Sequence, residues 1–215
     1  MDELSEVKAK TRHAYNLAAQ KYHELFHDEM TQKQYDRDLL DRFSRSFGQR
    51  SLVCDAGCGP SAHIGRYVFD KGVPVVGVDI SDRCTETARR HNPGMSIVQA
   101  DIAELPFATE RLDGIIAYYS IIDTPKAHVG RIFKEFRRTL HPGGSLLLAV
   151  KSGAGEGYQP ELLGIGAEIW FALFSEAEIA GYYERAGFEL EFLDRRDPYG
   201  FEIANERIFA IGRRR

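Results

Sequence analysis

The stretch that decides the fold reads Ser51-Leu-Val-Cys-Asp-Ala-Gly-Cys-Gly-Pro-Ser-Ala62 and, after a short helical pattern, Pro74-Val-Val-Gly-Val-Asp79. An apolar run enters a turn that contains Gly57 and Gly59, and a second apolar run ends on a carboxylate. Glycine lacks a Cβ, so the backbone can turn sharply here and a ligand can approach it closely. A following helix would point free N–H groups at that ligand. We expect two adjacent parallel strands whose carboxyl ends form a nucleoside site.

Two carboxylates indicate which nucleoside this site would hold. Asp79 follows Gly59 by 20 residues and ends the second strand, where an acidic side chain can accept hydrogen bonds from a ribose. The pattern Gly57-x-Gly59-x-x-Ala62 also fits the loose dinucleotide fingerprint, so the glycines alone leave NAD open. Asp55, two residues before Gly57, would repel a pyrophosphate. It suits a cationic ligand such as S-adenosylmethionine, which carries an ammonium and a sulfonium.

Five motifs in this order resemble those of the class I S-adenosylmethionine-dependent methyltransferases. They are Val53-Cys-Asp-Ala-Gly-Cys-Gly59, Val76-Gly-Val-Asp-Ile-Ser81, Gln99-Ala-Asp-Ile-Ala-Glu-Leu-Pro-Phe107, Asp113-Gly-Ile-Ile-Ala-Tyr-Tyr119 and Leu140-His-Pro-Gly-Gly-Ser-Leu-Leu-Leu148. Pro60-Ser61 departs from the family, because many members have a third glycine there. The resemblance implies an α/β fold with a doubly wound, mostly parallel, seven-stranded Rossmann-like sheet, an antiparallel C-terminal strand and N-terminal cap helices.

Composition limits the number of domains and the class of partner. A chain of 215 residues, 43% hydrophobic, can bury one sizeable core, and continuous strand–helix alternation favours a single methyltransferase domain over 1–215. We divide it into cap helices (1–48), a cofactor-binding core (49–151), an acceptor-site insertion or lid (152–175), and a C-terminal helix and strand pair (176–215). The formal net charge of −4 argues against a nucleic-acid partner.

Other sequence features bear on metal, membrane and location. Cys54, Cys58 and Cys84 lack zinc-ligand spacing, and no His/Cys/Asp cluster suggests a metal, so none is expected. No stretch of about 18 apolar residues exists, and the acidic start does not read as a signal peptide. We therefore expect a cytoplasmic protein without a membrane partner, whose oligomeric state stays open.

Hydrophobic periodicity predicts the secondary structure. Helices are expected at 5–30, 35–47, 62–71, 82–91 and 126–140, and strands at 51–55, 73–79, 96–100, 113–119 and 145–151. Ser175-Glu-Ala-Glu178 indicates a capping box that begins a helix ending near Arg185. Strands at 188–193 and 207–212, joined by a loop, suggest an antiparallel pair at the sheet edge.

The resemblance also implies cofactor contacts, each with a structural alternative. Asp79 would bind the ribose hydroxyls, or else cap a helix. Asp55 would lie next to the ammonium, or only anchor the turn. Asp101 would contact the adenine amine, or act as an N-cap. Tyr15 and Tyr22 would reach the methionine moiety or merely pack their helix. The remaining implied contacts are Lys33 with the cofactor carboxylate, Gly57, Cys58 and Gly59 in the turn, Ile80, Ile102 and Leu105 around the adenine, and Ala117 and Tyr118 beneath the sulfonium.

Acceptor residues are harder to assign, because the leaving group of a sulfonium methyl transfer needs no protonation. The enzyme must mainly align the reacting atoms and exclude water, with a base only for a protonated acceptor. Tyr119 and Asp123 are catalytic candidates, although Asp123 before Thr124-Pro125 also suits a turn. Candidate substrate contacts are Ser120, Lys151, Tyr158, Trp170 and Phe174, with packing of the insertion as the alternative for Trp170. His63 and His128 are interpreted as helix-surface residues.

These observations favour an S-adenosylmethionine-dependent methyltransferase that acts on a small molecule by in-line displacement, with S-adenosylhomocysteine as product. Two alternatives stay open. One is an NAD(P)-dependent oxidoreductase, which Asp55 and the antiparallel ending oppose. The other is a non-catalytic S-adenosylmethionine-binding protein that has the same fold and no acceptor pocket.

Overall fold

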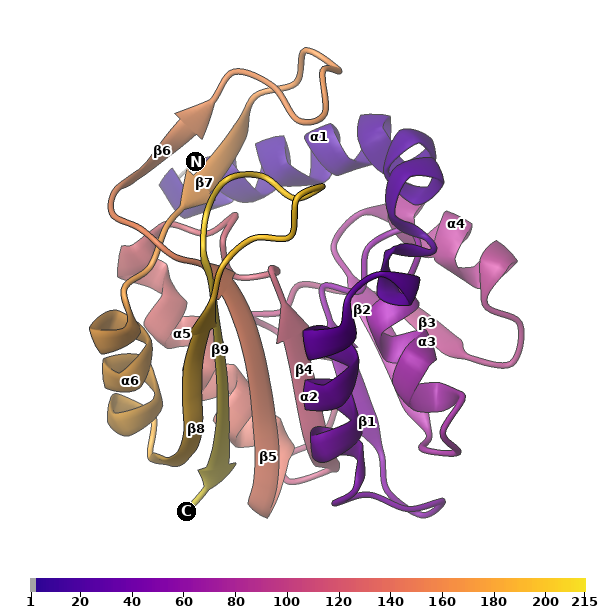
Figure 1. The fold of residues 1–215 in the computed structure, drawn as a ribbon, viewed down its shortest axis with the longest axis vertical. Helices are drawn as coiled ribbons and strands as arrows, with labels where there is room; N and C mark the ends of the chain where they lie inside the picture. Colours follow the sequence, from indigo (N-terminus) through magenta and orange to yellow (C-terminus); the bar gives the residue numbers. More distant parts are fainter. Residues whose placement is uncertain (1–2) are drawn as a thin grey trace.

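The computed structural model describes residues 3–215 (Figure 1). From β1 to β5 strands and helices alternate, except that β4 follows β3 with no helix between them. The helices are α1 (Glu3–Phe26), α2 (Gln34–Ser44), α3 (His63–Phe69), α4 (Asp82–His91), α5 (Lys126–Thr139) and α6 (Glu176–Arg185), with a short 3₁₀ helix η1 (Glu29–Thr31). The strands are β1 (Val53–Ala56), β2 (Val75–Asp79), β3 (Ser96–Gln99), β4 (Leu112–Tyr118), β5 (Leu140–Lys151), β6 (Glu156–Gln159), β7 (Ile169–Ala172), β8 (Phe188–Arg196) and β9 (Arg207–Arg214).

Seven strands form one sheet in the order β3-β2-β1-β4-β5-β9-β8. The first five are parallel, and β9 runs antiparallel to both β5 and β8. The strand order reverses between β1 and β4, and the carboxyl ends of strands at such a switch point leave a crevice for a ligand. The predicted doubly wound sheet with an antiparallel C-terminal strand is confirmed.

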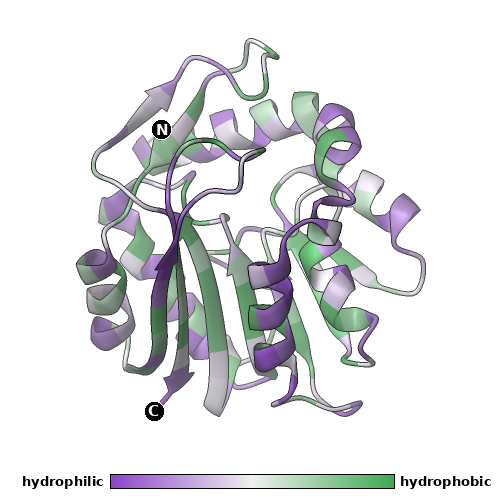
Figure 2. Cartoon of the chain, viewed as in Figure 1, coloured by the Kyte–Doolittle hydropathy of each residue, from purple (hydrophilic) through white to green (hydrophobic). Residues whose placement is uncertain are grey.

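Helices cover both faces of the sheet because its central strands are apolar on both sides. One hydrophobic core joins the sheet to α5 and α6 through residues such as Phe133, Phe136 and Tyr183. The second core joins the opposite face to α2 and α3 through Leu40, Phe43 and others. Figure 2 shows the hydrophobic strands at the centre and the hydrophilic outer surfaces of α2 and α6.

Two segments close the carboxyl end of the sheet. The helix α1 lies across it and packs on α4 and β7 (Figure 1). The insertion 152–175, for which the sequence predicted no strands, forms an antiparallel hairpin of β6 and β7 in which Tyr158 pairs with Trp170. Among residues 3–215, no helix is both long and apolar enough to cross a membrane.

Several boundaries differ from the predictions for local reasons. The first helix ends at Phe26 instead of continuing to residue 30, and η1 follows it after two residues. The helix α5 ends at Thr139, and β5 begins at once at Leu140, which pairs with Leu112 of β4. The expected capping box is confirmed: Ser175 accepts the Glu178 N–H, and the Glu178 carboxylate accepts the Ser175 N–H.

Candidate cofactor and acceptor site

The glycine turn after β1 is tied directly to the end of β2. Gly57 and Gly59 have φ of 82° and 63°, the left-handed region that favours glycine. A Cβ on Gly57 would lie 2.2 Å from the Cβ of Ser120, so no larger residue fits there. The Gly59 N–H donates to Asp79 Oδ2 at 2.9 Å, and the Ser81 N–H donates to Asp79 Oδ1 at 2.9 Å. Asp79 is thereby fixed at the end of β2.

Asp55 is buried beneath the turn. Its Oδ2 accepts the Gly65 N–H at 2.9 Å, which anchors the first turn of α3 to β1. Burial raises the pKa of Asp55 to about 7 and that of Asp79 to about 6. Asp55 therefore ties the first turn of α3 to β1, and it also lines the cavity described next.

A cavity of about 900 Å³ runs from the glycine turn to the carboxyl ends of β4 and β5 and the start of β9, beneath α1 and the β6–β7 hairpin. Most of the predicted site residues line it, which brings together segments from both ends of the chain. These residues are Tyr15, Tyr22, Lys33, Asp55, Gly57, Cys58, Gly59, Asp79, Ile80, Asp101, Ile102, Tyr118, Tyr119, Ser120, Asp123 and Lys151.

Other predicted site residues lie outside the cavity lining. Ala117, Leu105 and Phe174 are buried in the core between the sheet and α5–α6, because their side chains point into that layer. Trp170 packs edge-on against Tyr158 with ring centroids 5.1 Å apart, and the Lys10 ammonium lies 4.2 Å from the centroid of the Tyr158 ring. Trp170 and Tyr158 thus stabilise the hairpin itself, as the packing alternative for Trp170 expected.

The helix α1 is held over the cavity by polar contacts. The Tyr15 hydroxyl donates to Asp123 Oδ2 at 2.8 Å. Lys8 forms an ion pair with Asp101, whose Oδ1 also accepts the Ala103 N–H at 2.8 Å. The Asp101 carboxylate is therefore shared between a local turn and α1, and Asp101 still lines the cavity.

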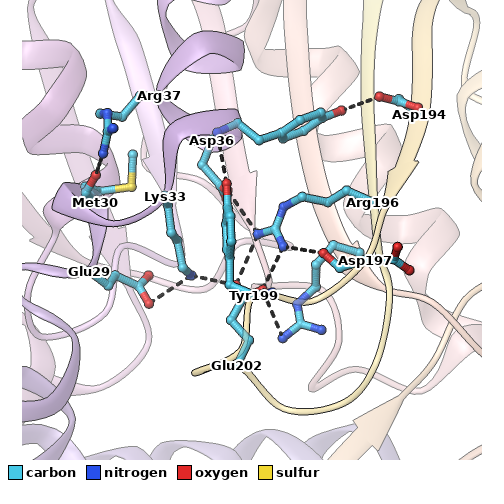
Figure 3. Close-up of polar contacts among 12 residues, drawn as sticks. Glu29, Met30, Lys33, Asp36, Arg37, Asp194, Arg196, Asp197, Tyr199 and Glu202 are labelled. Atoms are coloured by element: carbon cyan, nitrogen blue, oxygen red, sulfur yellow. Dashed lines mark hydrogen bonds and ion pairs between the residues drawn. The ribbon is translucent and has the colours of Figure 1, made fainter.

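A buried charged cluster joins the start of α2 to the loop between β8 and β9 (Figure 3). Lys33 forms ion pairs with Glu29 at 2.9 Å and with Glu202 at 3.0 Å. Glu202 also pairs with Arg196 at 2.7 Å, and Arg196 pairs with Asp36 at 3.0 Å. Lys33, predicted to bind the cofactor carboxylate, thus faces the cavity with its ammonium already between two carboxylates.

The interpretation of His63 as a surface residue is wrong. Its side chain is 11% exposed and lines the cavity, and its Nε2 lies 2.8 Å from Glu29 Oε1. The reason is that α3 begins at His63, directly after the glycine turn, so the first residue of the helix faces the cavity. His128, in the first turn of α5, lines the cavity as well.

The end of β4 places several unpaired hydroxyl groups at the cavity. Tyr119 has a φ of 56°, which a bulky side chain seldom adopts and which occurs at functional sites more often than elsewhere. Within residues 3–215, the buried hydroxyls of Tyr118, Tyr119 and Ser120 have no hydrogen-bond partner. Buried polar groups are normally paired, and these three hydroxyls are exceptions to that rule.

Sequence reasoning missed several residues that line the cavity. The missed lining residues include Thr11, Glu29, Phe171, Phe201, Glu202, Ile203, Asn205 and Arg207. Phe201, Glu202, Ile203 and Asn205 lie in the β8–β9 loop, which has no periodicity, and Arg207 begins β9. Glu29 and Glu202 are joined through Lys33. The sequence signal for this loop is its mixture of charged and aromatic residues between two apolar strands. That mixture does not indicate which other residues the loop contacts.

Comparisons with known proteins agree with this geometry. Residues 53–144 match a family model for a methyltransferase domain. A malonyl-[acyl-carrier protein] O-methyltransferase from Enterobacter lignolyticus is 33% identical over 135 residues, which cover 62% of this chain and 50% of that protein. A probable tRNA methyltransferase 9B from Homo sapiens is 31% identical over 156 residues, which cover 69% of this chain and 32% of that protein. The chain thus spans about half or less of the length of these curated relatives.

A solved structure resembles the whole chain. The 1,6-didemethyltoxoflavin-N1-methyltransferase from Burkholderia thailandensis, crystallised with S-adenosylhomocysteine, superposes with a TM-score of 0.76 at 18% identity. The match covers 100% of this chain and 91% of that one. The matched methyltransferase domain, the sheet order and this likeness in fold bear out the resemblance to the class I S-adenosylmethionine-dependent methyltransferases that the five motifs predicted.

Proposed function

We propose that this chain binds S-adenosylmethionine in the cavity and transfers its methyl group to a small-molecule acceptor. The observation that carries the proposal is the Asp79 carboxylate, fixed at the end of β2 by the Gly59 and Ser81 N–H groups and lining the cavity. A carboxylate offers about four acceptor positions, and the Gly59, Ser81 and Ile80 N–H groups leave one of them for a ribose hydroxyl.

The charges around the turn support a cationic cofactor. Asp55 in β1 and Asp79 at the end of β2 both line the cavity beside the glycine turn. Carboxylates favour the ammonium and sulfonium of S-adenosylmethionine and repel a pyrophosphate. The NAD(P)-dependent alternative is therefore disfavoured at the same positions that favour the proposal.

The acceptor end supports a small substrate. Beyond the unpaired Tyr118 and Tyr119 hydroxyls, the cavity continues between β5, the β6–β7 hairpin and the β8–β9 loop. These walls hold a compact molecule away from bulk water, which suits an in-line displacement that depends on alignment. When bound, the cofactor supplies the electrophilic methyl group. The protein's part is to orient the acceptor toward it.

Calorimetric titration with S-adenosylhomocysteine and with NAD tests the cofactor. We expect binding of the first only. The Asp79→Ala variant should lose at least tenfold in affinity, since hydrogen bonds to a charged group contribute about 1.5–3 kcal/mol. Asp70→Ala, which removes an exposed carboxylate paired only with Arg66, is the matched control. Unchanged binding by Asp79→Ala would refute the ribose assignment.

Turnover of methyl-labelled S-adenosylmethionine tests the acceptor class. Small metabolites, a carrier protein and tRNA would be compared, because curated relatives are named for the last two kinds of substrate. Label in a small molecule supports the proposal. Label only in tRNA or protein contradicts the small-molecule part, and tight cofactor binding without any transfer favours the non-catalytic alternative.

A further inference from the structure

Two groups of opposite charge face the acceptor end of the cavity from neighbouring parallel strands. Asp123 follows β4, and Lys151 is the last residue of β5. Each affects the ionisation of the other, yet no ion pair joins them among residues 3–215. A ligand group can therefore lie between a carboxylate and an ammonium.

One carboxylate oxygen of Asp123 accepts a hydrogen bond from the protein, and the other is free to accept one from a ligand. Its Oδ2 accepts the Tyr15 hydroxyl at 2.8 Å, and its Oδ1 accepts no hydrogen bond from the described residues. Loss of solvent raises the pKa of Asp123 to about 7, with Asp79 also raising it and Lys151 lowering it. A carboxylate in this range can accept a proton near neutral pH.

Among the Lys and Arg side chains of residues 3–215 that line the cavity, Lys151 is the one without a carboxylate partner. Its ammonium lies 4.9 Å from the centroid of the Phe171 ring. No carboxylate of the described chain forms an ion pair with it, whereas Lys33 has two such partners. Burial, Arg207 and Lys33 lower the pKa of Lys151, while Asp123 and Glu202 raise it. A partly buried, unpaired ammonium gains most from a ligand that carries negative charge.

The mouth of the cavity is apolar. Leu25, Phe201 and Ile203 line it and are 53%, 54% and 63% exposed, respectively, although large apolar side chains are usually covered. Leu162 and Leu163 of the β6–β7 loop complete this rim. The rim fits the apolar body of a ligand whose polar group reaches inward to Lys151.

We propose that the acceptor is an oxygen acid, a phenol or an enol, on an apolar body; this inference rests on the proposed function. Its hydroxyl lies between Asp123 and Lys151. Asp123 Oδ1 takes the hydroxyl proton, and Lys151 stabilises the oxyanion. An oxygen electron pair forms the bond to the methyl carbon as the carbon–sulfur bond breaks, leaving that bond's electron pair on a neutral thioether. Asp123 then returns the proton to water. A cationic acceptor would be repelled by Lys151.

Binding of 4-nitrophenol to the protein saturated with S-adenosylhomocysteine tests the oxyanion site, because its phenolate and phenol absorb at different wavelengths. We expect it to bind as phenolate. Lys151→Met should weaken this binding at least tenfold, whereas Lys134→Met, an exposed lysine of α5, should bind as the wild type does. Asp123→Asn should bind the phenolate as well or better, since it removes a negative charge.

Methyl transfer tests the base. With labelled S-adenosylmethionine, Asp123→Asn should slow transfer to 4-methylphenol, a weak acid, by about 10²- to 10⁴-fold. It should slow transfer to the readily ionised 4-nitrophenol much less. A merely structural role would slow both equally.

Several outcomes would overturn this inference. In the transfer experiment, they are an equal loss of rate for the two phenols in Asp123→Asn, or no transfer to either phenol by the wild type. In the binding experiment, they are undiminished phenolate binding by Lys151→Met, or no phenolate binding by wild-type protein that binds S-adenosylhomocysteine. Failure to bind S-adenosylhomocysteine would instead refute the proposed function.

Discussion

At the scale of single residues, two buried carboxyls should make cofactor affinity depend on pH. The pKa of Asp79 is about 6 and that of Asp55 about 7, and both face the proposed cofactor end. Ribose hydroxyls and an ammonium bind the ionised forms better. Affinity for S-adenosylhomocysteine should therefore level off above about pH 8 and fall as pH decreases below the two pKa values, by about tenfold per pH unit for each group that must ionise. Calorimetric titration from pH 5 to 8 measures this profile.

Proton release provides a second check on these two residues. Binding that requires ionised carboxyls releases protons near pH 6, so the apparent binding enthalpy should differ between buffers of different ionisation enthalpy. Asp55→Asn should remove the part of the profile near pH 7 and retain the part near pH 6. A profile that is flat in the wild type would mean that neither carboxyl contacts the ligand.

At the scale of elements, the capping box of α6 should contribute measurably to stability. Ser175→Ala removes the acceptor of the Glu178 N–H, a bond of 3.2 Å, and leaves that donor unpaired. We expect a loss of about 1 kcal/mol in the free energy of urea unfolding. Ser46→Ala, at an exposed serine beyond α2, should change it by less than about 0.5 kcal/mol. Equal changes in the free energy of unfolding for Ser175→Ala and Ser46→Ala would show that the cap does not stabilise α6.

The charged cluster should hold the β8–β9 loop against α2. Glu202→Gln leaves Lys33 and Arg196 buried with less compensating charge, which costs about 3 kcal/mol or more when one partner of a buried pair is removed. Glu206→Gln in the same loop breaks only an exposed pair with Arg195 and should cost less than about 1 kcal/mol. Urea unfolding gives both values. Limited proteolysis should cut 197–206 faster in Glu202→Gln alone.

Elements with a strong local pattern were predictable, and those that depend on distant partners were not. The helix Asp82–His91 has the predicted bounds, because a serine cap and an apolar stripe define it locally. The β6–β7 hairpin follows a glycine-rich run and is stabilised by its own cross-strand aromatic pair and by α1, so no single segment encodes it. The sequence motifs indicated the residues of the glycine turn that line the cavity, because each motif is continuous in sequence. They missed the loop around Glu202, which meets the rest of the cavity only in the folded chain.

At the scale of the whole molecule, the free energy of unfolding should depend on pH in two opposite ways. The pKa values of Asp55, Asp79 and Asp123, about 7, 6 and 7, lie above the ordinary value of 3.8, because burial opposes their ionisation. The folded protein therefore holds more protons than the unfolded chain between pH 4 and 7, and stability should fall as pH rises through this window. Glu202 has the opposite effect on stability. Arg196 and Lys33 lower its pKa to about 2, although burial alone would raise it. The stability that the ionised Glu202 contributes is therefore lost as pH falls below 4.5.

The cofactor-free protein should consequently be most stable at about pH 3.5, where the gain from ionising Glu202 and the loss from the three buried aspartates balance. Urea unfolding from pH 3 to 8 measures the curve, and Asp123→Asn should flatten its decline between pH 5 and 7 without altering the acid side. Glu202→Gln should lower the maximum and flatten the acid side instead. Bound S-adenosylhomocysteine, which favours the ionised carboxyls, should move the maximum toward neutral pH by mass action. A cofactor-free maximum at pH 7 or above would show that these carboxyls are ionised at no cost in the folded protein.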